Sequence, residues 1–229
     1  MKRIVYACDV GSTKPKTNNF AWVREDLASK LNPIGSQKIE ELVDCLRQDI
    51  KGNASIALGF ESPLFMPVPT DYEQLSCGRD GEGSSSMFAP AGGYVTTLGC
   101  QQAAFVLKNI FPDRLSHELT LDAARWTCAD KPMLLLWEAF VSGKAHTTNG
   151  NDIQDAATAA HDFHINNDQL EASASVDSTH DCFSFIGAAA LWSGWTESPS
   201  MIRSKCLVLR PEQKYSGVIH PFRSLADIQ

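Results

Sequence analysis

Short runs of consecutive apolar residues alternate along the chain with longer segments in which apolar residues recur every three or four positions. Runs of the first kind predict buried strands, and the second spacing predicts amphipathic helices. The predicted strands cover residues 3–10, 19–24, 55–60, 133–141 and 205–209. Between residues 27 and 35 the pattern is weak, so we expect a short strand there or none.

The predicted helices cover residues 36–51, 92–110, 115–128, 152–164 and 181–194. Ser36 is the expected cap of the first helix, and Gly52 is its expected stop. Residues 62–90 contain several prolines and glycines and predict a long irregular loop, which in a compact domain is usually functional or disordered. Strands that alternate with helices predict an α/β fold. Because no Ser-, Gly- or Pro-rich linker divides the chain, we expect a single domain over residues 1–229.

Acidic residues lie at the ends of apolar runs, at Asp9, Glu61 and Glu138. Open α/β sheets bind ligands at the carboxyl ends of their strands, and converging carboxylates hold hard divalent cations. A carboxylate beside a buried strand is unfavourable unless it is paired or bound to a metal, which favours a functional role for Asp9 and Glu61. Asp155 and Asp181, near predicted helix starts, are candidates for a further ligand. Capping and the helix dipole explain such aspartates equally well.

Other polar residues suggest weaker candidates. Arg79 could hold a phosphate through its planar guanidinium, or it could be a solvated loop residue paired with Glu82. His161 and His164 are three residues apart and would share a helix face. Since no third ligand is evident near them in the sequence, we expect a surface pair or a pair satisfied by hydrogen bonds.

Composition limits the partners. The 229-residue chain has a net charge of −7, which argues against a broad basic surface for nucleic acid. It does not exclude an enzyme that meets phosphate through bound Mg²⁺, because the ion supplies positive charge. Seven scattered cysteines without a CxxC pair are typical of a reduced, cytoplasmic protein. No apolar stretch approaches the ~20 residues that span a bilayer, so we expect no membrane segment.

Several short motifs follow one another along the chain in a recognisable order. The strand ending Asp9-Val10-Gly11 is followed by Gly59-Phe60-Glu61-Ser62-Pro63-Leu64-Phe65, by Cys77-Gly78-Arg79-Asp80-Gly81-Glu82-Gly83 and by Met87-Phe88-Ala89-Pro90. An acid-bearing strand, Trp137-Glu138-Ala139-Phe140, and an Asp-started, alanine-rich helix from Asp181 close the series. The whole series resembles an uncharacterised family of predicted nucleases with a ribonuclease-H-like fold.

That resemblance implies a mixed sheet flanked by helices and Mg²⁺- or Mn²⁺-dependent hydrolysis of a phosphodiester, in nucleic acid or in a small phosphoester. Two-metal phosphodiesterases need several carboxylates around ions ~3.5–4 Å apart. By this resemblance Asp9, Glu61 and Asp181 bind the metal, and Asp155 is the alternative to Asp181. Glu138 completes or supports the cluster, and Arg79 holds the phosphate.

Two other functions stay open at this point. A non-catalytic scaffold of the same fold could bind a partner or a small molecule. A sugar-kinase-like phosphotransferase could use the turn Asp9-Val10-Gly11-Ser12-Thr13 to cradle phosphate, although no second phosphate motif is evident.

Overall fold

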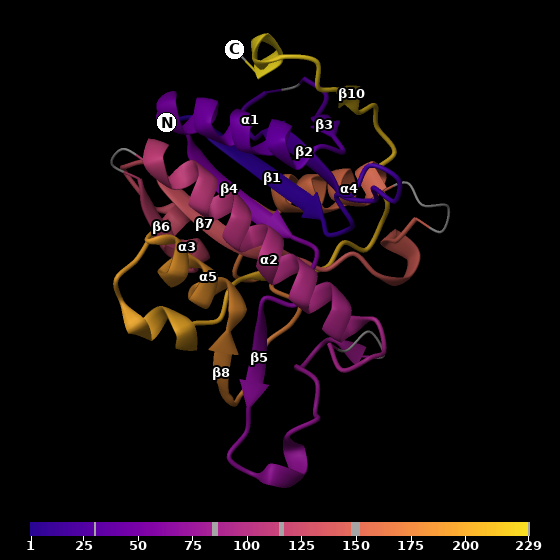
Figure 1. Ribbon diagram of the computed structural model, residues 1–229, viewed down its shortest axis with the longest axis vertical. Coiled ribbons are helices and arrows are strands. Elements are labelled where there is room, and N and C mark those ends of the chain that lie inside the picture. Colours follow the sequence, from indigo (N-terminus) through magenta and orange to yellow (C-terminus); the bar gives the residue numbers. More distant parts are fainter. Residues whose placement is uncertain (30, 84–86, 115–116, 148–151, 229) are drawn as a thin grey trace.

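A mixed β-sheet with helices on both faces forms the centre of the molecule (Figure 1). The computed structural model describes residues 1–29, 31–83, 87–114, 117–147 and 152–228. The strands of the main sheet are β1 (Arg3–Asp9), β2 (Ala21–Asp26), β3 (Ile34–Ser36), β4 (Ser55–Phe60), β6 (Glu118–Thr120), β7 (Met133–Ala139), β9 (Val208–Leu209) and β10 (His220–Pro221). The helices are α1 (Ile39–Lys51), α2 (Gly92–Ile110), α3 (Ala123–Thr127), α4 (Asp152–Ile165) and α5 (Phe185–Ser193). The predicted α/β class is confirmed.

The strands follow the order β10-β3-β2-β1-β4-β7-β6, and β9 also pairs with β7. β2 is antiparallel to both β1 and β3, whereas β1, β4, β7 and β6 run parallel to one another. The carboxyl ends of β1, β4 and β7 therefore meet at one edge of the sheet.

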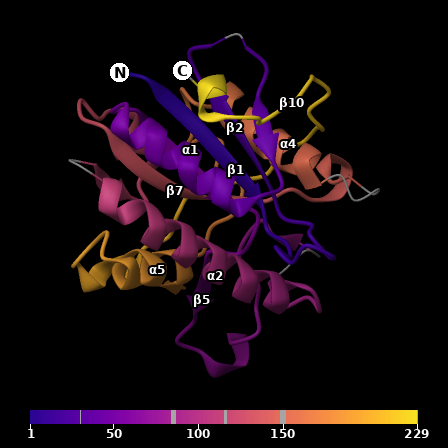
Figure 2. The same cartoon turned by 45° about the horizontal axis from the view of Figure 1, so that its top comes forward.

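Alternation along β1 divides the core between the two faces, because successive side chains of a strand point in opposite directions. Ile4, Tyr6 and Cys8 pack toward α1, α2 and α5, and Figure 2 shows α1 and α2 lying over this face. Val5 and Ala7 point to the other face, which α3 and α4 cover.

Most predicted elements are present, and the weak third strand exists as the three residues of β3. The first helix begins later than expected. Its N-cap is Lys38, and Ser36 belongs to β3, where its hydroxyl contacts Glu41. Gly52 ends the helix as predicted.

The predicted helix at 115–128 is wrong in part. Its described residues form the edge strand β6, which pairs with β7, and then the short helix α3. The boundary is set by Asp122, whose side chain accepts a hydrogen bond from Arg125 N (3.0 Å) and caps α3.

Two strands form a separate small sheet that extends away from the helical layers (Figure 1). β5 (Phe65–Val68) lies within the segment 62–90 that we expected to be irregular, and β8 (Asp181–Ser184) pairs with it antiparallel. The predicted helix at 181–194 therefore starts four residues late. Ser184 caps α5 by accepting a hydrogen bond from Gly187 N (3.0 Å).

None of the helices in the described ranges combines the length and the apolar character that a membrane span requires.

Candidate active site

Asp9 and Glu61 leave the sheet side by side. Cys8 and Phe60 are paired in the parallel ladder of β1 and β4, and Glu61 N donates a hydrogen bond to Cys8 O (2.8 Å). Asp9 lies two residues after Ala7, and Glu61 lies four residues after Ala57. Strand alternation therefore turns both carboxylates toward the face that carries α4.

The first turn of α4 supplies two more carboxylates to the same place. Asp152 and Asp155 are three residues apart, so they lie on one side of the helix. Asp155 is buried, and α4 packs across β1 and β2. The four acids thus come from the ends of two neighbouring strands and the start of one helix.

These four carboxylates influence one another electrostatically. Burial, together with the negative charges of Asp152 and Asp155, raises the pKa of Asp9 to about 8. Burial also raises the pKa of Glu61 well above its usual range, and Asp9, Asp155 and Asp152 add to the effect. In a poorly solvated pocket, like charges disfavour ionisation of one another, and a bound cation would relieve that repulsion.

Asp155 is held in place by the segment that precedes α4. The backbone N and the hydroxyl of Thr147 donate to its Oδ1 at 2.9 and 2.5 Å. His146 Nδ1 lies 2.7 Å from its Oδ2. His146 and Glu61 also line a cavity of about 370 Å³. Sequence reasoning did not identify His146 or Thr147, because they lie in a segment without apolar periodicity.

The cluster offers ligands for a hard divalent cation, but no three of these described carboxylates bring ligand atoms within 4.8 Å of one another, so an ion would have to draw them together. All of its donors are carboxylate oxygens, and Glu61 Oε2 is buried with no hydrogen-bond partner among the described residues. An uncompensated buried oxygen is costly, and a metal ion would satisfy it.

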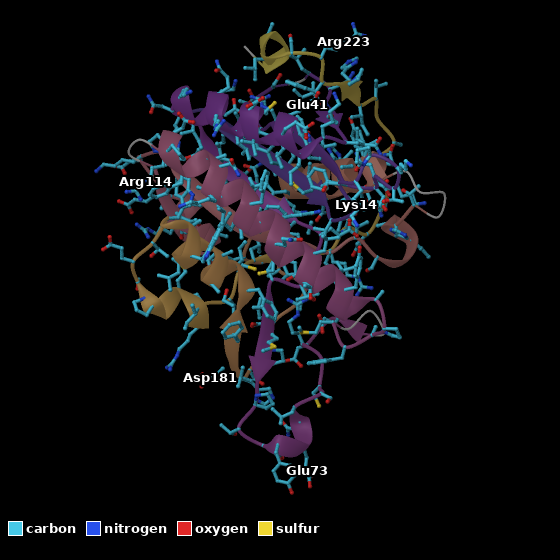
Figure 3. The ribbon with its side chains drawn as sticks, viewed as in Figure 1. Lys14, Glu41, Glu73, Arg114, Asp181 and Arg223 are labelled. Atoms are coloured by element: carbon cyan, nitrogen blue, oxygen red, sulfur yellow. The ribbon has the colours of Figure 1, made fainter. Side chains whose placement is uncertain are left out.

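Asp181, the preferred third ligand from the sequence, does not join this cluster. It is an exposed residue of β8 that pairs with Val68 in the small sheet. Figure 3 labels it near that sheet, well away from Lys14 in the turn that follows β1. The physical reason is that residues 181–184 pair with β5, so they are not the first turn of α5. Asp155, the alternative, lies with Asp9 and Glu61.

Glu138 and Arg79 form a buried ion pair with each other. Arg79 Nη1 and Nη2 donate to the two oxygens of Glu138 at 2.7 and 2.6 Å, and Arg79 Nε donates to Glu82 (2.8 Å). Leu64 N also donates to Glu138 (2.8 Å). Burial raises the pKa of Glu138, and Arg79 opposes that rise. Arg79 is paired with Glu82, as one of the two interpretations predicted, but it is buried and not solvated. Its guanidinium nitrogens already bind Glu138 and Glu82.

A second cluster lies at the other end of α4. Glu25 of β2, His161 and His164 bring one ligand atom each to within 4.8 Å of one another, which is a possible metal-binding triad. The structure thus places Glu25 beside the histidine pair as a third candidate ligand, which the sequence analysis did not identify. Strand alternation in β2 could have identified Glu25, because its side chain points to the same face as Val23, beneath α4.

Comparisons of the chain with protein-family models, with curated proteins and with solved structures gave no match. Function is therefore inferred from the geometry of the two clusters.

Proposed function

We propose that the protein is a metal-dependent phosphodiesterase of the nuclease type, with a ribonuclease-H-like fold and Mg²⁺ or Mn²⁺ as its cofactor. The observation that carries the proposal is the buried Glu61 Oε2, which has no hydrogen-bond partner among the described residues and lies near the charges of Asp9, Asp155 and Asp152. Like charges gather in a poorly solvated pocket only where a cation or shared protons compensate them.

The sheet supports the proposed fold. Its central order β3-β2-β1-β4-β7, with β2 antiparallel to its neighbours, agrees with a ribonuclease-H-like sheet. The motif order of the sequence points the same way, with acids at the ends of the first and fourth strands.

Asp9, Glu61 and Asp155 would hold the metal, and Asp152 would add negative charge at its side. When bound, the ion would activate water and stabilise the leaving oxygen, as in other metal-dependent phosphodiesterases. Thr147 fixes the orientation of Asp155 through two hydrogen bonds. His146, between Asp155 and the cavity, is positioned to exchange a proton with a bound group.

The cavity beside Glu61 limits the substrate. Its volume of about 370 Å³ lies near the lower end for small-molecule sites, and Pro63, Val95 and Phe140 give it apolar walls. Such walls can pack against one nucleobase. Together with the net charge of −7, this favours a flexible strand end or a small phosphoester over a long duplex.

Asp9→Asn tests the proposal directly. It should reduce Mn²⁺-dependent cleavage of a chromogenic phosphodiester or a short single strand by about 100-fold or more, since metal stabilisation of the transition state is worth several kcal/mol. Asp181→Asn is the matched control, because it removes an exposed carboxylate outside the cluster. Full activity of Asp9→Asn would refute the assignment.

Calorimetric titration with Mg²⁺ and Mn²⁺ separates the enzyme from a non-catalytic scaffold. The proposal requires binding that Asp9→Asn weakens and Asp181→Asn leaves unchanged. If the protein binds neither ion, the result would favour the non-catalytic scaffold over the metal-dependent enzyme.

A further inference from the structure

Glu25, His161 and His164 form a cluster that the proposed nuclease site does not use. Nine residues separate Asp155 from His164 along α4, which corresponds to about 13 Å of helix rise. Glu25 pairs with Val5 in the β1–β2 ladder, whereas Asp9 pairs with Ala21 at the opposite end. The two clusters therefore lie at opposite ends of the same helix and strand pair.

The cluster contains two buried polar atoms whose hydrogen-bonding needs are not met. His164 Nδ1 contacts Glu25 Oε1, but Glu25 Oε2 and His161 Nδ1 have no hydrogen-bond partner within the described part of the chain. Glu25 is only 7% exposed. A buried polar group left unsatisfied costs about 1–3 kcal/mol, so a simple Glu25–His164 ion pair does not account for the arrangement.

The spacing of His161 and Glu25 is close to that of two metal ligands, whereas His164 and Glu25 are in direct contact. His161 Nδ1 lies 3.7 Å from Glu25 Oε1, and tetrahedral zinc with bonds of ~2.1 Å separates its ligand atoms by roughly 3.4 Å. Because His164 Nδ1 and Glu25 Oε1 are in direct contact, a bound ion would have to move these two side chains apart to be held by both. His161 and His164 are three residues apart on α4, so both imidazoles lie on one side of the helix, above Glu25.

The ligand types select the metal. Two imidazole nitrogens and one carboxylate suit Zn²⁺ and similar transition ions, whereas Mg²⁺ prefers oxygen ligands. His161 also lines a cavity of about 800 Å³, and its ring packs against Tyr215 with centroids 4.9 Å apart. A site with three protein ligands beside a cavity keeps a fourth position for water or another ligand.

We propose that Glu25, His161 and His164 form a Zn²⁺ site with an open coordination position on the side of the cavity beside Tyr215. This site is chemically distinct from the carboxylate cluster. It stands independently of the proposed phosphodiesterase activity.

Calorimetric titration of the full chain with Zn²⁺, in excess Mg²⁺ to occupy the carboxylate cluster, tests the site. The wild-type protein should bind one equivalent. His161→Asn and Glu25→Gln should each weaken binding by at least about tenfold, since loss of even an outer-shell partner costs about 10–100-fold. His180→Asn removes a histidine elsewhere and should change nothing, and Asp9→Asn should also leave Zn²⁺ binding intact.

Zinc binding that is equal in the wild type, His161→Asn and Glu25→Gln would overturn the proposal, as would a wild type that binds no Zn²⁺. His161 is the safer variant, because its side chain is 41% exposed and folding should not depend on it. Co²⁺ gives a second measurement. A tetrahedral site should produce a visible absorption band that His161→Asn weakens, and a band unaffected by that change would also refute the site.

Discussion

At the scale of single residues, Gly59 shows how one position without a side chain shapes the site. Gly59 of β4 is paired with Trp137 of β7, and a Cβ atom on Gly59 would lie 2.3 Å from the Trp137 ring. Trp137 is fully buried and packs against Phe163 of α4 with ring centroids 4.9 Å apart. The glycine therefore lets the indole lie close to the sheet beneath the helix that carries Asp155.

Gly59→Ala should destabilise the protein by about 1–3 kcal/mol, because the added methyl must displace a buried indole from its packed position. Urea unfolding would measure the loss. Gly93→Ala is the matched control. Gly93 lies in α2, a Cβ there would meet nothing within 4 Å, and alanine favours a helix. Equal stability of Gly59→Ala and wild type would contradict this account of the packing.

At the scale of elements, the Arg79–Glu138–Glu82 network attaches the segment after β5 to the central strand β7. Arg79 also lies over the ring of Phe65, 4.6 Å from its centroid. One buried guanidinium pairs with two buried carboxylates, so the contribution of each group depends on its partners. The role of Arg79 is thus structural in this arrangement, and its guanidinium is not presented to the carboxylate cluster.

Arg79→Ala should cost about 3–5 kcal/mol, because it leaves Glu138 and Glu82 buried without their cationic partner. Hydrogen exchange should increase first in β5 and in the residues around Arg79. Arg125→Ala is the control, since Arg125 pairs with Glu118 on the surface, where such pairs contribute about 1 kcal/mol or less. An Arg79→Ala protein with unchanged stability but weaker substrate binding would instead favour a phosphate clamp.

Element boundaries explain which site residues the sequence could identify. Asp9 and Glu61 directly follow short buried apolar runs, so the local pattern alone located them. Asp181 was misassigned because Asp181–Ser184 pair with β5, a strand more than a hundred residues earlier in the chain. The local sequence pattern contains no information about such a distant partner. The helix predicted over residues 181–194 therefore included the residues that form β8.

At the scale of the whole molecule, the carboxylate cluster links stability to pH. The pKa of Asp9 rises from an ordinary value of 3.8 to about 8, so the folded protein binds this proton more tightly than the unfolded chain does. The corresponding stability is fully present below about pH 4 and is lost as the pH rises through about 8.

Metal-free protein should therefore lose thermal stability between pH 5 and pH 9, and Asp9→Asn should flatten this part of the profile. The difference between the melting profiles of wild type and Asp9→Asn isolates the effect of Asp9 from that of other acids. A metal-free wild type whose profile coincides with that of Asp9→Asn would contradict the raised pKa.

Mg²⁺ should stabilise the wild type more at pH 8 than at pH 5, because the cation binds the ionised carboxylates and competes with protons at low pH. Asp9→Asn should reduce this stabilisation, and melting curves with and without Mg²⁺ would measure it. Stabilisation that is the same at both pH values would argue against binding at this cluster.

The sequence by itself determined the α/β class, most of the buried strands and the two acids at the ends of β1 and β4, because apolar periodicity and strand ends are local properties of the chain. Only the tertiary structure decided which further residues meet them. α4 brings Asp155 to Asp9 at one of its ends and two histidines to Glu25 at the other, while β8 takes Asp181 away. Those outcomes depend on strand register and helix packing between residues far apart in the chain, which no local pattern encodes.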